Sequence, residues 1–134
     1  MQIVLATNNA HKLTEVRAIL AGCGLEVASP ADLGLELDVE EVGVTFRENA
    51  LLKAMACHRG TGLAALGDDS GLVVEALGGR PGVLSARYAG RHGDDAANTA
   101  RVLAELAALP GVSRAAAFVC SLAWVDAHGG AHFF

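Results

Sequence analysis

Three polar clusters in the sequence combine the residue types that phosphate and metal chemistry requires. The first is the run Thr7-Asn8-Asn9-Ala10-His11-Lys12, which follows the apolar segment Ile3–Ala6. A polar turn between a strand and a helix can offer backbone N–H groups and the positive end of the helix dipole to an anion. Lys12 adds a mobile positive charge. The alternative interpretation is an ordinary asparagine-rich turn that carries a solvated lysine.

The second cluster begins at Glu41 and continues onto a predicted helix. Glu41 stands two residues before Gly43, a glycine that lets the backbone come close to a ligand. Asn49 and Lys53 are four residues apart and therefore share one face of the helix that starts at Thr45. The alternative is a capped surface helix with an exposed lysine.

The third cluster is Asp68-Asp69-Ser70-Gly71, at the end of a predicted strand. Magnesium prefers hard oxygen ligands and usually takes one or two carboxylates together with phosphate oxygens and water. If the backbone is extended here, neighbouring side chains point to opposite faces, so that one aspartate faces the ligand and the other braces the turn. An Asx-turn without a function is the alternative.

The choice of basic residues supports a phosphate site. The chain has eight arginines and only two lysines, and both lysines fall within these clusters. A compact, flexible ammonium is the group that arginine cannot replace. The sequence has no P-loop and no G-x-G-x-x-G motif, no closely spaced cysteines or histidines that would bind zinc, and no nucleophile elbow around its serines.

Strands and helices alternate along the chain, which predicts an α/β fold. In open α/β sheets, ligands bind beyond the carboxyl ends of the strands, where the three clusters are expected to lie. The predicted strands are Gln2–Ala6, Leu25–Ala28, Leu63–Leu66 and Ala115–Val125, with extended structure resuming over Leu72–Leu77. The predicted helices are His11–Ala21, Thr45–His58 and Asp94–Leu109, with a structured loop at Gly78–Gly90 and a hairpin turn at Asp126–Gly130.

Composition limits the class of protein. With 134 residues, of which 52% are hydrophobic, the chain predicts one domain with a packed core. The net charge of −5 argues against binding to a nucleic-acid polymer, although a few local cations can hold a single nucleotide. The longest apolar stretch, Ala115–Val125, falls short of the roughly 20 residues that a membrane helix needs.

Two further expectations concern location and chain length. The three cysteines are odd in number and widely spaced, which favours reduced core thiols in a cytoplasmic protein. Ala131–Phe134 has the pattern of the first residues of a returning strand. A two-stranded ribbon needs its partner for hydrogen bonding, so we expect the domain to be C-terminally incomplete.

The clusters resemble motifs of the inosine triphosphate pyrophosphatase family, also called the Ham1-like family or XTP/dITP diphosphatases. Thr7–Lys12 fits the family's [ST]-x-N-x-x-K phosphate motif. The resemblance continues through Glu41–Ala50, Lys53-Ala54, Asp68–Leu72 and Gly79–Gly90, in the family's order and spacing. It covers the first two-thirds of the chain and includes both lysines.

The resemblance implies an activity and a role for each matching residue. Family members hydrolyse ITP, dITP and XTP to the monophosphate and pyrophosphate. By this resemblance, Asp69 is the catalytic base, Glu41 and Asp69 hold Mg²⁺, and the substrate is bound by Thr7, Asn8, Asn9, Ala10, His11, Lys12, Lys53 and Ser70. The implied fold is a long, twisted mixed sheet flanked by helices, with two lobes, a nucleotide cleft between them, and a homodimeric assembly.

Two motifs of the family, a Gly-Tyr-Asp-Pro-type and a Ser-His-Arg-Gly-type segment that help to enclose the purine, do not occur in these residues. We therefore expect the base-reading residues to lie beyond residue 134. One alternative is the related Maf-like nucleotide pyrophosphatases, whose Ser-x-Ser-Pro-Arg-Arg-type opening does not fit Thr7–Lys12. The other is a catalytically impaired module that binds nucleotides or mediates dimerisation.

Overall fold

The computed structural model describes residues Met1–Phe134, which divide into two compact units. The first unit comprises Met1–Asp69 and Ser121–Phe134, and the second comprises Ser70–Cys120. Two long strands, β3 (Ala64–Val74) and β4 (Ala116–Val125), contribute residues to both units. The polar clusters of the sequence lie almost entirely in the first unit.

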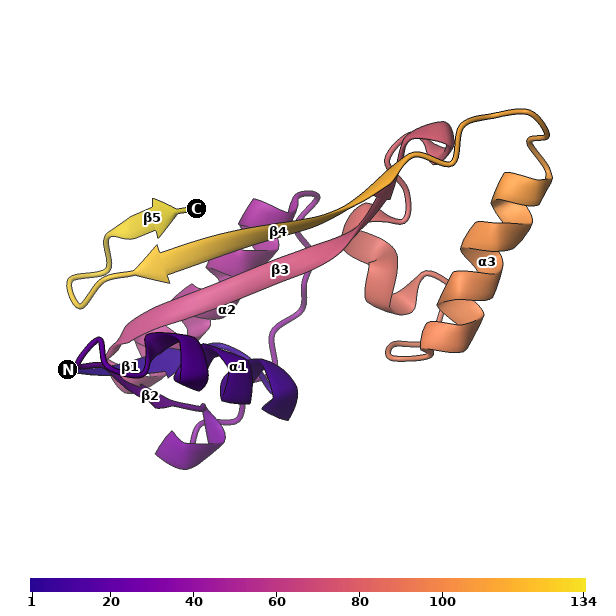
Figure 1. The fold of residues 1–134 in the computed structure, drawn as a ribbon. Coiled ribbons are helices and arrows are strands. Elements are labelled where there is room, and N and C mark those ends of the chain that lie inside the picture. Colours follow the sequence, from indigo (N-terminus) through magenta and orange to yellow (C-terminus); the bar gives the residue numbers. More distant parts are fainter. The chain divides into compact units, whose positions relative to one another are not determined.

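A mixed five-stranded sheet with the order β2-β1-β3-β4-β5 organises the chain (Figure 1). β1 (Gln2–Leu5) pairs in parallel with both β2 (Glu26–Ala28) and β3, whereas β4 pairs antiparallel with β5 (Ala131–Phe133). The expected α/β class with a mixed sheet and flanking helices is confirmed. The register of β1 on β3 ends with Leu5 opposite Leu66. β3 therefore continues past the end of β1 just where its two aspartates stand.

Two helices cover opposite faces of this sheet: α1 (Ala10–Leu20) and α2 (Phe46–Thr61). Because side chains alternate along a strand, Ile3 and Leu5 of β1 pack on the side of α1, and Val4 packs on the side of α2. The helix residues in these two clusters are Leu13, Val16 and Leu20 from α1, and Ala50, Leu51, Ala54, Met55 and Cys57 from α2.

The start of α2 is fixed by the capping box that the sequence predicts. Thr45 Oγ1 accepts from the backbone N–H of Glu48 at 3.1 Å, and the Glu48 carboxylate accepts from the Thr45 N–H at 3.3 Å. The helix extends to Thr61, beyond the predicted end at His58, and stops because Gly62 adopts a left-handed conformation with φ +72°. At the start of this helix Phe46 is only partly buried, whereas Asn49 is fully buried.

A glycine on β3 lets α2 approach the sheet closely. A Cβ atom at Gly67 would lie 2.2 Å from the carbonyl oxygen of Ala50 and 3.1 Å from Cβ of Ala54. Both alanines are fully buried. The backbones of helix and strand are therefore in contact here, one turn from Lys53 and two residues before Asp69.

One element differs from the sequence prediction near this contact. The segment Gly67–Gly71 was expected to be a turn between two strands, but β3 runs through it without interruption from Ala64 to Val74. The residues just before this segment, Ala64–Leu66, pack into the cores on both faces of the sheet. Lys12 and Asn49 then hold Asp68 and Asp69 from the two sides, and these tertiary contacts override the turn tendency of the Asp-Asp-Ser-Gly sequence.

The second unit has its own small core. α3 (Asp95–Ala107) is capped by Asp94, whose side chain accepts from the Ala97 N–H. Val102 and Leu106 of α3 pack with Tyr88 and with Val74 at the end of β3. Three short 3₁₀ helices complete the chain: η1 (Ala31–Leu33) in the first unit, and η2 (Glu75–Leu77) and η3 (Gly82–Arg87) in the second. The predicted loop at Gly78–Gly90 thus contains regular structure.

The cysteines differ from the expectation of three core thiols. Only Cys57 is buried, and burial raises its pKa to about 11, whereas Cys23 and Cys120 are exposed.

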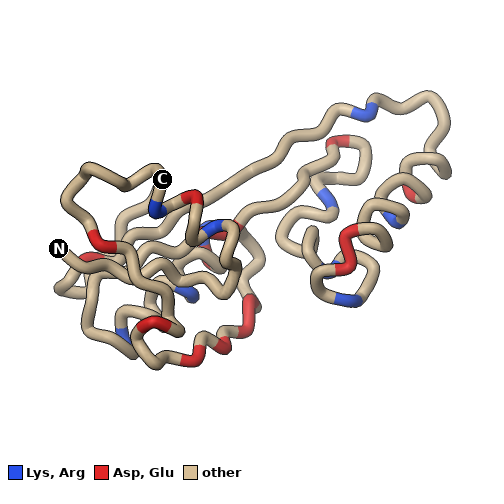
Figure 2. The backbone as a smooth tube through the Cα atoms, turned by 60° about the horizontal axis from the view of Figure 1, so that its bottom comes forward, with Lys and Arg blue, Asp and Glu red and all other residues tan.

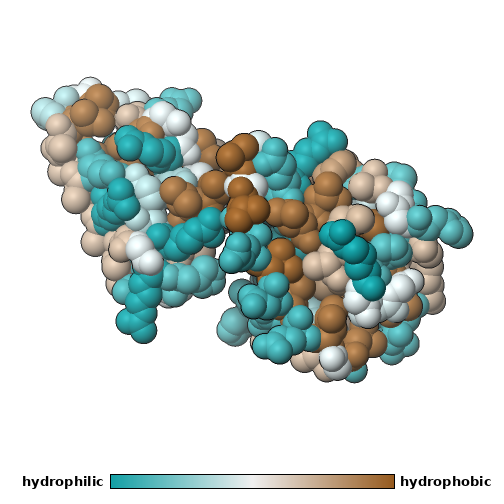
Figure 3. All heavy atoms as spheres, turned by 180° about the vertical axis from the view of Figure 1, so that it is seen from behind, coloured by the Kyte–Doolittle hydropathy of each residue, from teal (hydrophilic) through white to brown (hydrophobic).

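On the face drawn in Figure 3, hydrophobic and hydrophilic residues both reach the surface. A membrane-spanning helix would need a length and an apolar character that none of the helices combines.

We predict that Gly67→Ala destabilises the protein, because its Cβ would collide with the backbone of α2. The free energy of unfolding should fall by about 1–3 kcal/mol, the usual range for overpacking a core. The matched control is Gly60→Ala, also at α2, where the nearest atoms are the mobile methyl ends of Leu35 and alanine favours the helix. Urea denaturation of both variants measures the difference, and equal stabilities would contradict the close contact.

Candidate active site

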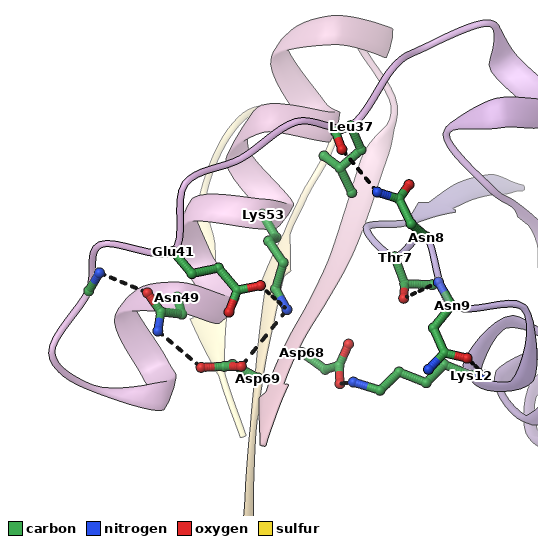
Figure 4. A network of polar contacts seen from close by, with 11 residues as sticks. Thr7, Asn8, Asn9, Lys12, Leu37, Glu41, Asn49, Lys53, Asp68 and Asp69 are labelled. Atoms are coloured by element: carbon green, nitrogen blue, oxygen red, sulfur yellow. Dashed lines mark hydrogen bonds and ion pairs between the residues drawn. The ribbon is translucent and has the colours of Figure 1, made fainter. Parts of the chain in front are cut away.

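Adjacent aspartates on β3 each meet a lysine, and the two lysines come from different helices (Figure 4). Asp68 forms an ion pair with Lys12 of α1, whereas Asp69 faces Lys53 of α2. The alternation expected for an extended backbone is therefore confirmed. Asp68 was expected to stabilise a turn, but the strand continues here, and Asp68 instead holds Lys12 near the start of α1.

Asp69 lies at the centre of the α2 side of the site. Its side chain is buried, its Oδ2 accepts from Asn49 Nδ2 at 3.1 Å, and its Oδ1 lies 4.0 Å from Lys53 Nζ. Glu41, in the segment before α2, places its Oε1 3.5 Å from the same Nζ. The side chain of Lys53 is only 13% exposed. Two carboxylates separated by 28 positions in the sequence thus face one ammonium group.

The charges of this cluster favour a divalent cation. Asp68, Asp69 and Glu41 supply three negative charges against the two positive charges of Lys12 and Lys53. The acidic residues Glu36, Asp38 and Glu40 lie along the segment that leads to Glu41 (Figure 2). A polyanion approaching this cluster meets an excess of negative charge, which a divalent cation would reverse.

The donor set also suits a hard cation. Glu41 and Asp69 offer carboxylate oxygens, and Mg²⁺ typically takes one or two carboxylates while the substrate and water supply the remaining ligands. There is no group of three or more histidine, cysteine, aspartate or glutamate side chains that could hold a metal by itself. The residues present therefore fit a metal that is shared with a phosphate substrate.

The turn between β1 and α1 is more internally bonded than the sequence suggests. Asn9 is the N-cap of α1, and its Oδ1 accepts from the backbone N–H groups of His11 and Lys12 at 2.9 and 3.2 Å. Thr7 Oγ1 accepts from the Asn9 N–H at 3.1 Å. These three N–H groups, which we expected to face an anion, are bonded to side chains because the helix start needs capping.

A small pocket nevertheless opens at this turn. Its lining residues are Thr7, Asn8, Asn9, Ala10, Leu13, Ser29 and Ala31. Asn8 also donates from Nδ2 to the carbonyl oxygen of Leu37 at 3.0 Å, which ties the turn to the acidic segment. His11 is exposed and does not line the pocket.

The structure thus brings together some of the residues singled out in the sequence. Lys12, Lys53 and Glu41 lie around the aspartate pair of β3. Thr7–Ala10 line the pocket at the turn, His11 lies outside it, and Ser70 is the first residue of the second unit. Asn49 was noted for sharing a helix face with Lys53, but its contact with Asp69 was not predicted. The spacing of four residues between Asn49 and Lys53 could have indicated that both face the same strand.

Comparison with known proteins identifies the relatives of this chain. The model of the Ham1 family matches residues 3–134. The dITP/XTP pyrophosphatase of Streptomyces avermitilis is 54% identical over 125 residues, covering 91% of this chain and 62% of that protein. The protein of the same name from Mycobacterium bovis is 50% identical over 131 residues, covering 96% of this chain and 64% of that protein.

Solved structures agree with these matches. The nucleoside-triphosphatase, or dITP/XTP pyrophosphatase, of Mycobacterium abscessus superposes with a TM-score of 0.87 at 47% identity, covering 100% of this chain and 70% of that one. A Ham1 protein from Coxiella burnetii has a TM-score of 0.91 at 38% identity, covering 99% of this chain and 68% of that one. This chain spans 62% and 64% of the length of the two curated relatives named above. The family expected from the motifs is confirmed: the chain belongs to the Ham1 family.

Proposed function

We propose that the protein hydrolyses non-standard purine nucleoside triphosphates, namely ITP, dITP and XTP, to the monophosphate and pyrophosphate. The proposal rests on two carboxylates that face one ammonium group. Asp69 of β3 and Glu41, in the segment before α2, both face Lys53 of α2. The relatives named dITP/XTP pyrophosphatase, at 50–54% identity, support the same reaction and substrate class.

The lysines would handle the phosphate chain. Lys12 and Lys53 reach adjacent residues of β3 from opposite faces of the sheet, so their ammonium groups flank the strand position where Asp68 and Asp69 stand. Each would exchange part of its carboxylate contact for a phosphate oxygen and neutralise charge that develops there. Thr7, Asn8, Asn9 and Ala10 would line the phosphates from the pocket side, with His11 at its margin and Ser70 contacting substrate from β3.

Asp69 would act on the attacking water. Hydrolysis forms a bond from the water oxygen to phosphorus, breaks the bridging P–O bond of the α–β anhydride, and releases pyrophosphate as the leaving group. The water must lose a proton in this step, and a buried carboxylate held by a neighbouring amide is a suitable acceptor. Asp69 would orient this water and take its proton.

Glu41 and Asp69 would also hold Mg²⁺. When bound, the cation supplies Lewis-acid polarisation of the phosphate and charge neutralisation of the leaving pyrophosphate. Its two positive charges would turn the single negative excess of the cluster into a positive one, which an incoming triphosphate favours.

The remaining parts of the proposal come from the family. We propose that the chain acts as one nucleotide pyrophosphatase domain, that it works as a homodimer in the cytoplasm, and that it has no nucleic-acid polymer or membrane as a partner. The net charge of −5 supports the absence of a nucleic-acid partner.

The identity of the product tests the proposed reaction. We predict that the protein, incubated with ITP and Mg²⁺, releases IMP and pyrophosphate, and that removal of the metal by a chelator abolishes the reaction. Phosphorus NMR resolves the products during the first turnovers. Orthophosphate and IDP as the first products would contradict the proposal, because they would mean attack at the terminal phosphate.

A charge-conserving change at Lys53 tests its role in catalysis. In Lys53→Arg the planar guanidinium donates along fixed directions and cannot replace a compact ammonium between Glu41 and Asp69. We expect kcat/KM for ITP to fall by about tenfold or more, equivalent to about 1.4 kcal/mol in the barrier. The control is Arg59→Lys on the exposed side of the same helix, which should keep the parent kinetics. Parent-like kinetics in Lys53→Arg would show that any cation suffices there.

A further inference from the structure

Asn49 is a fully buried polar residue whose amide is bonded at both ends. Its Oδ1 accepts from the backbone N–H of Gly43 at 2.8 Å, and its Nδ2 donates to Asp69 Oδ2 at 3.1 Å. A buried amide left without partners would be costly, so these bonds define where the side chain must point. Asn49 thereby connects two segments of the site that are distant in sequence.

The direction of the amide follows from its partners. A backbone N–H can only donate, so the oxygen end of Asn49 must face Gly43. The NH₂ end must then face Asp69, where it donates to Oδ2 and leaves Oδ1 on the side of Lys53. The arrangement selects one rotation of the Asp69 carboxylate out of those that an aspartate can adopt.

The missing side chain of Gly43 leaves the space that the Asn49 amide occupies. A Cβ atom at Gly43 would lie 2.5 Å from Asn49 Oδ1 and 2.8 Å from Cβ of Glu48. The glycine is therefore needed for space, because any side chain would displace the Asn49 amide. Since Gly43 lies two residues after Glu41, the same hydrogen bond fixes the segment that carries the second carboxylate.

We propose that Asn49 is a positioning residue that sets the orientation of the Asp69 carboxylate and its placement relative to Glu41 and Lys53. In this proposal Asn49 acts through Asp69 and through the backbone of Gly43 and does not contact the substrate. The role in catalysis rests on the proposed pyrophosphatase function, whereas the positioning of Asp69 can be tested without it.

The kinetic test keeps the bond to Gly43 and removes the donor to Asp69. Asn49→Asp keeps an oxygen to accept from Gly43 but puts a second carboxylate beside Asp69 in place of the NH₂ donor, so Asn49→Leu, which adds no charge, is measured with it and must show the same fall. We expect kcat for ITP to fall by about 10- to 100-fold, as when a group that orients a ligand residue is lost, while KM changes little. The control is Thr45→Ala, which loses the cap of the same helix and some thermal stability but touches neither carboxylate, and should keep the parent kcat.

The structural test needs neither nucleotide nor turnover. A crystal structure of Asn49→Leu, which has a similar branched shape but no hydrogen-bonding group, should show the Asp69 carboxylate rotated from its parent orientation and the Gly43 segment displaced. Gly43→Ala perturbs the same contact from the other side, and serves in both tests if an Asn49 variant does not fold.

The outcomes separate the two claims. Asp69 in its parent orientation in folded Asn49→Leu or Gly43→Ala would overturn the positioning role, and so would a parent-like kcat in Asn49→Asp. A change confined to KM would also overturn it, because Asn49 would then act on substrate binding. If the parent protein releases no pyrophosphate, the proposed function fails, and the position of Asp69 in the variant structures still decides the role of Asn49.

Discussion

The arrangement of the site depends on the contact between α2 and β3 at Gly67. Because Gly67 has no side chain, and because α2 presents Ala50 and Ala54 to it, the helix backbone comes to rest on the strand. Asn49 and Lys53 flank these alanines on the helix, so they reach Asp69, two residues further along β3, within 3.1 and 4.0 Å. A larger residue at position 67 would move the helix away and lengthen both contacts. Packing of small residues thus determines the distances on which the chemistry depends.

A second constraint is the alternation of side chains on the extended strand. Asp68 therefore points toward Lys12 on α1, and Asp69 points toward Lys53 on α2. Two adjacent residues thus contact lysines on both faces of the sheet. A buried carboxylate is stable only when it is paired or hydrogen-bonded, and Asp69 meets that condition through Asn49 and Lys53. In the proposed reaction, the same pairing would hold the lysines in place before a phosphate arrives and would limit the reorganisation that binding requires.

Features determined by neighbouring residues could be predicted from the sequence, and features determined by distant contacts could not. The Thr45–Glu48 capping box is local, and the start of α2 was predicted correctly. The Asp-Asp-Ser-Gly segment has a local preference for a turn, but contacts of Asp68 with Lys12 and of Asp69 with Asn49 hold it extended as part of β3. Asn49 has the same polar pattern as a surface residue, and only the fold shows that it is buried against Asp69. The roles assigned to the phosphate-binding residues stay predictions.

The most direct test of the account compares the two aspartates of β3. If Asp69 binds the metal and takes the proton of the water, Asp69→Asn should lower pyrophosphate release from ITP by at least about 100-fold, the scale expected for loss of a general base. Asp68→Asn, which loosens only the bracing of Lys12, should retain most of the parent rate, and thermal unfolding should show that both variants are folded. Parent-like activity in Asp69→Asn, or equal losses in the two variants, would contradict the assignment of different roles to the two faces of the strand.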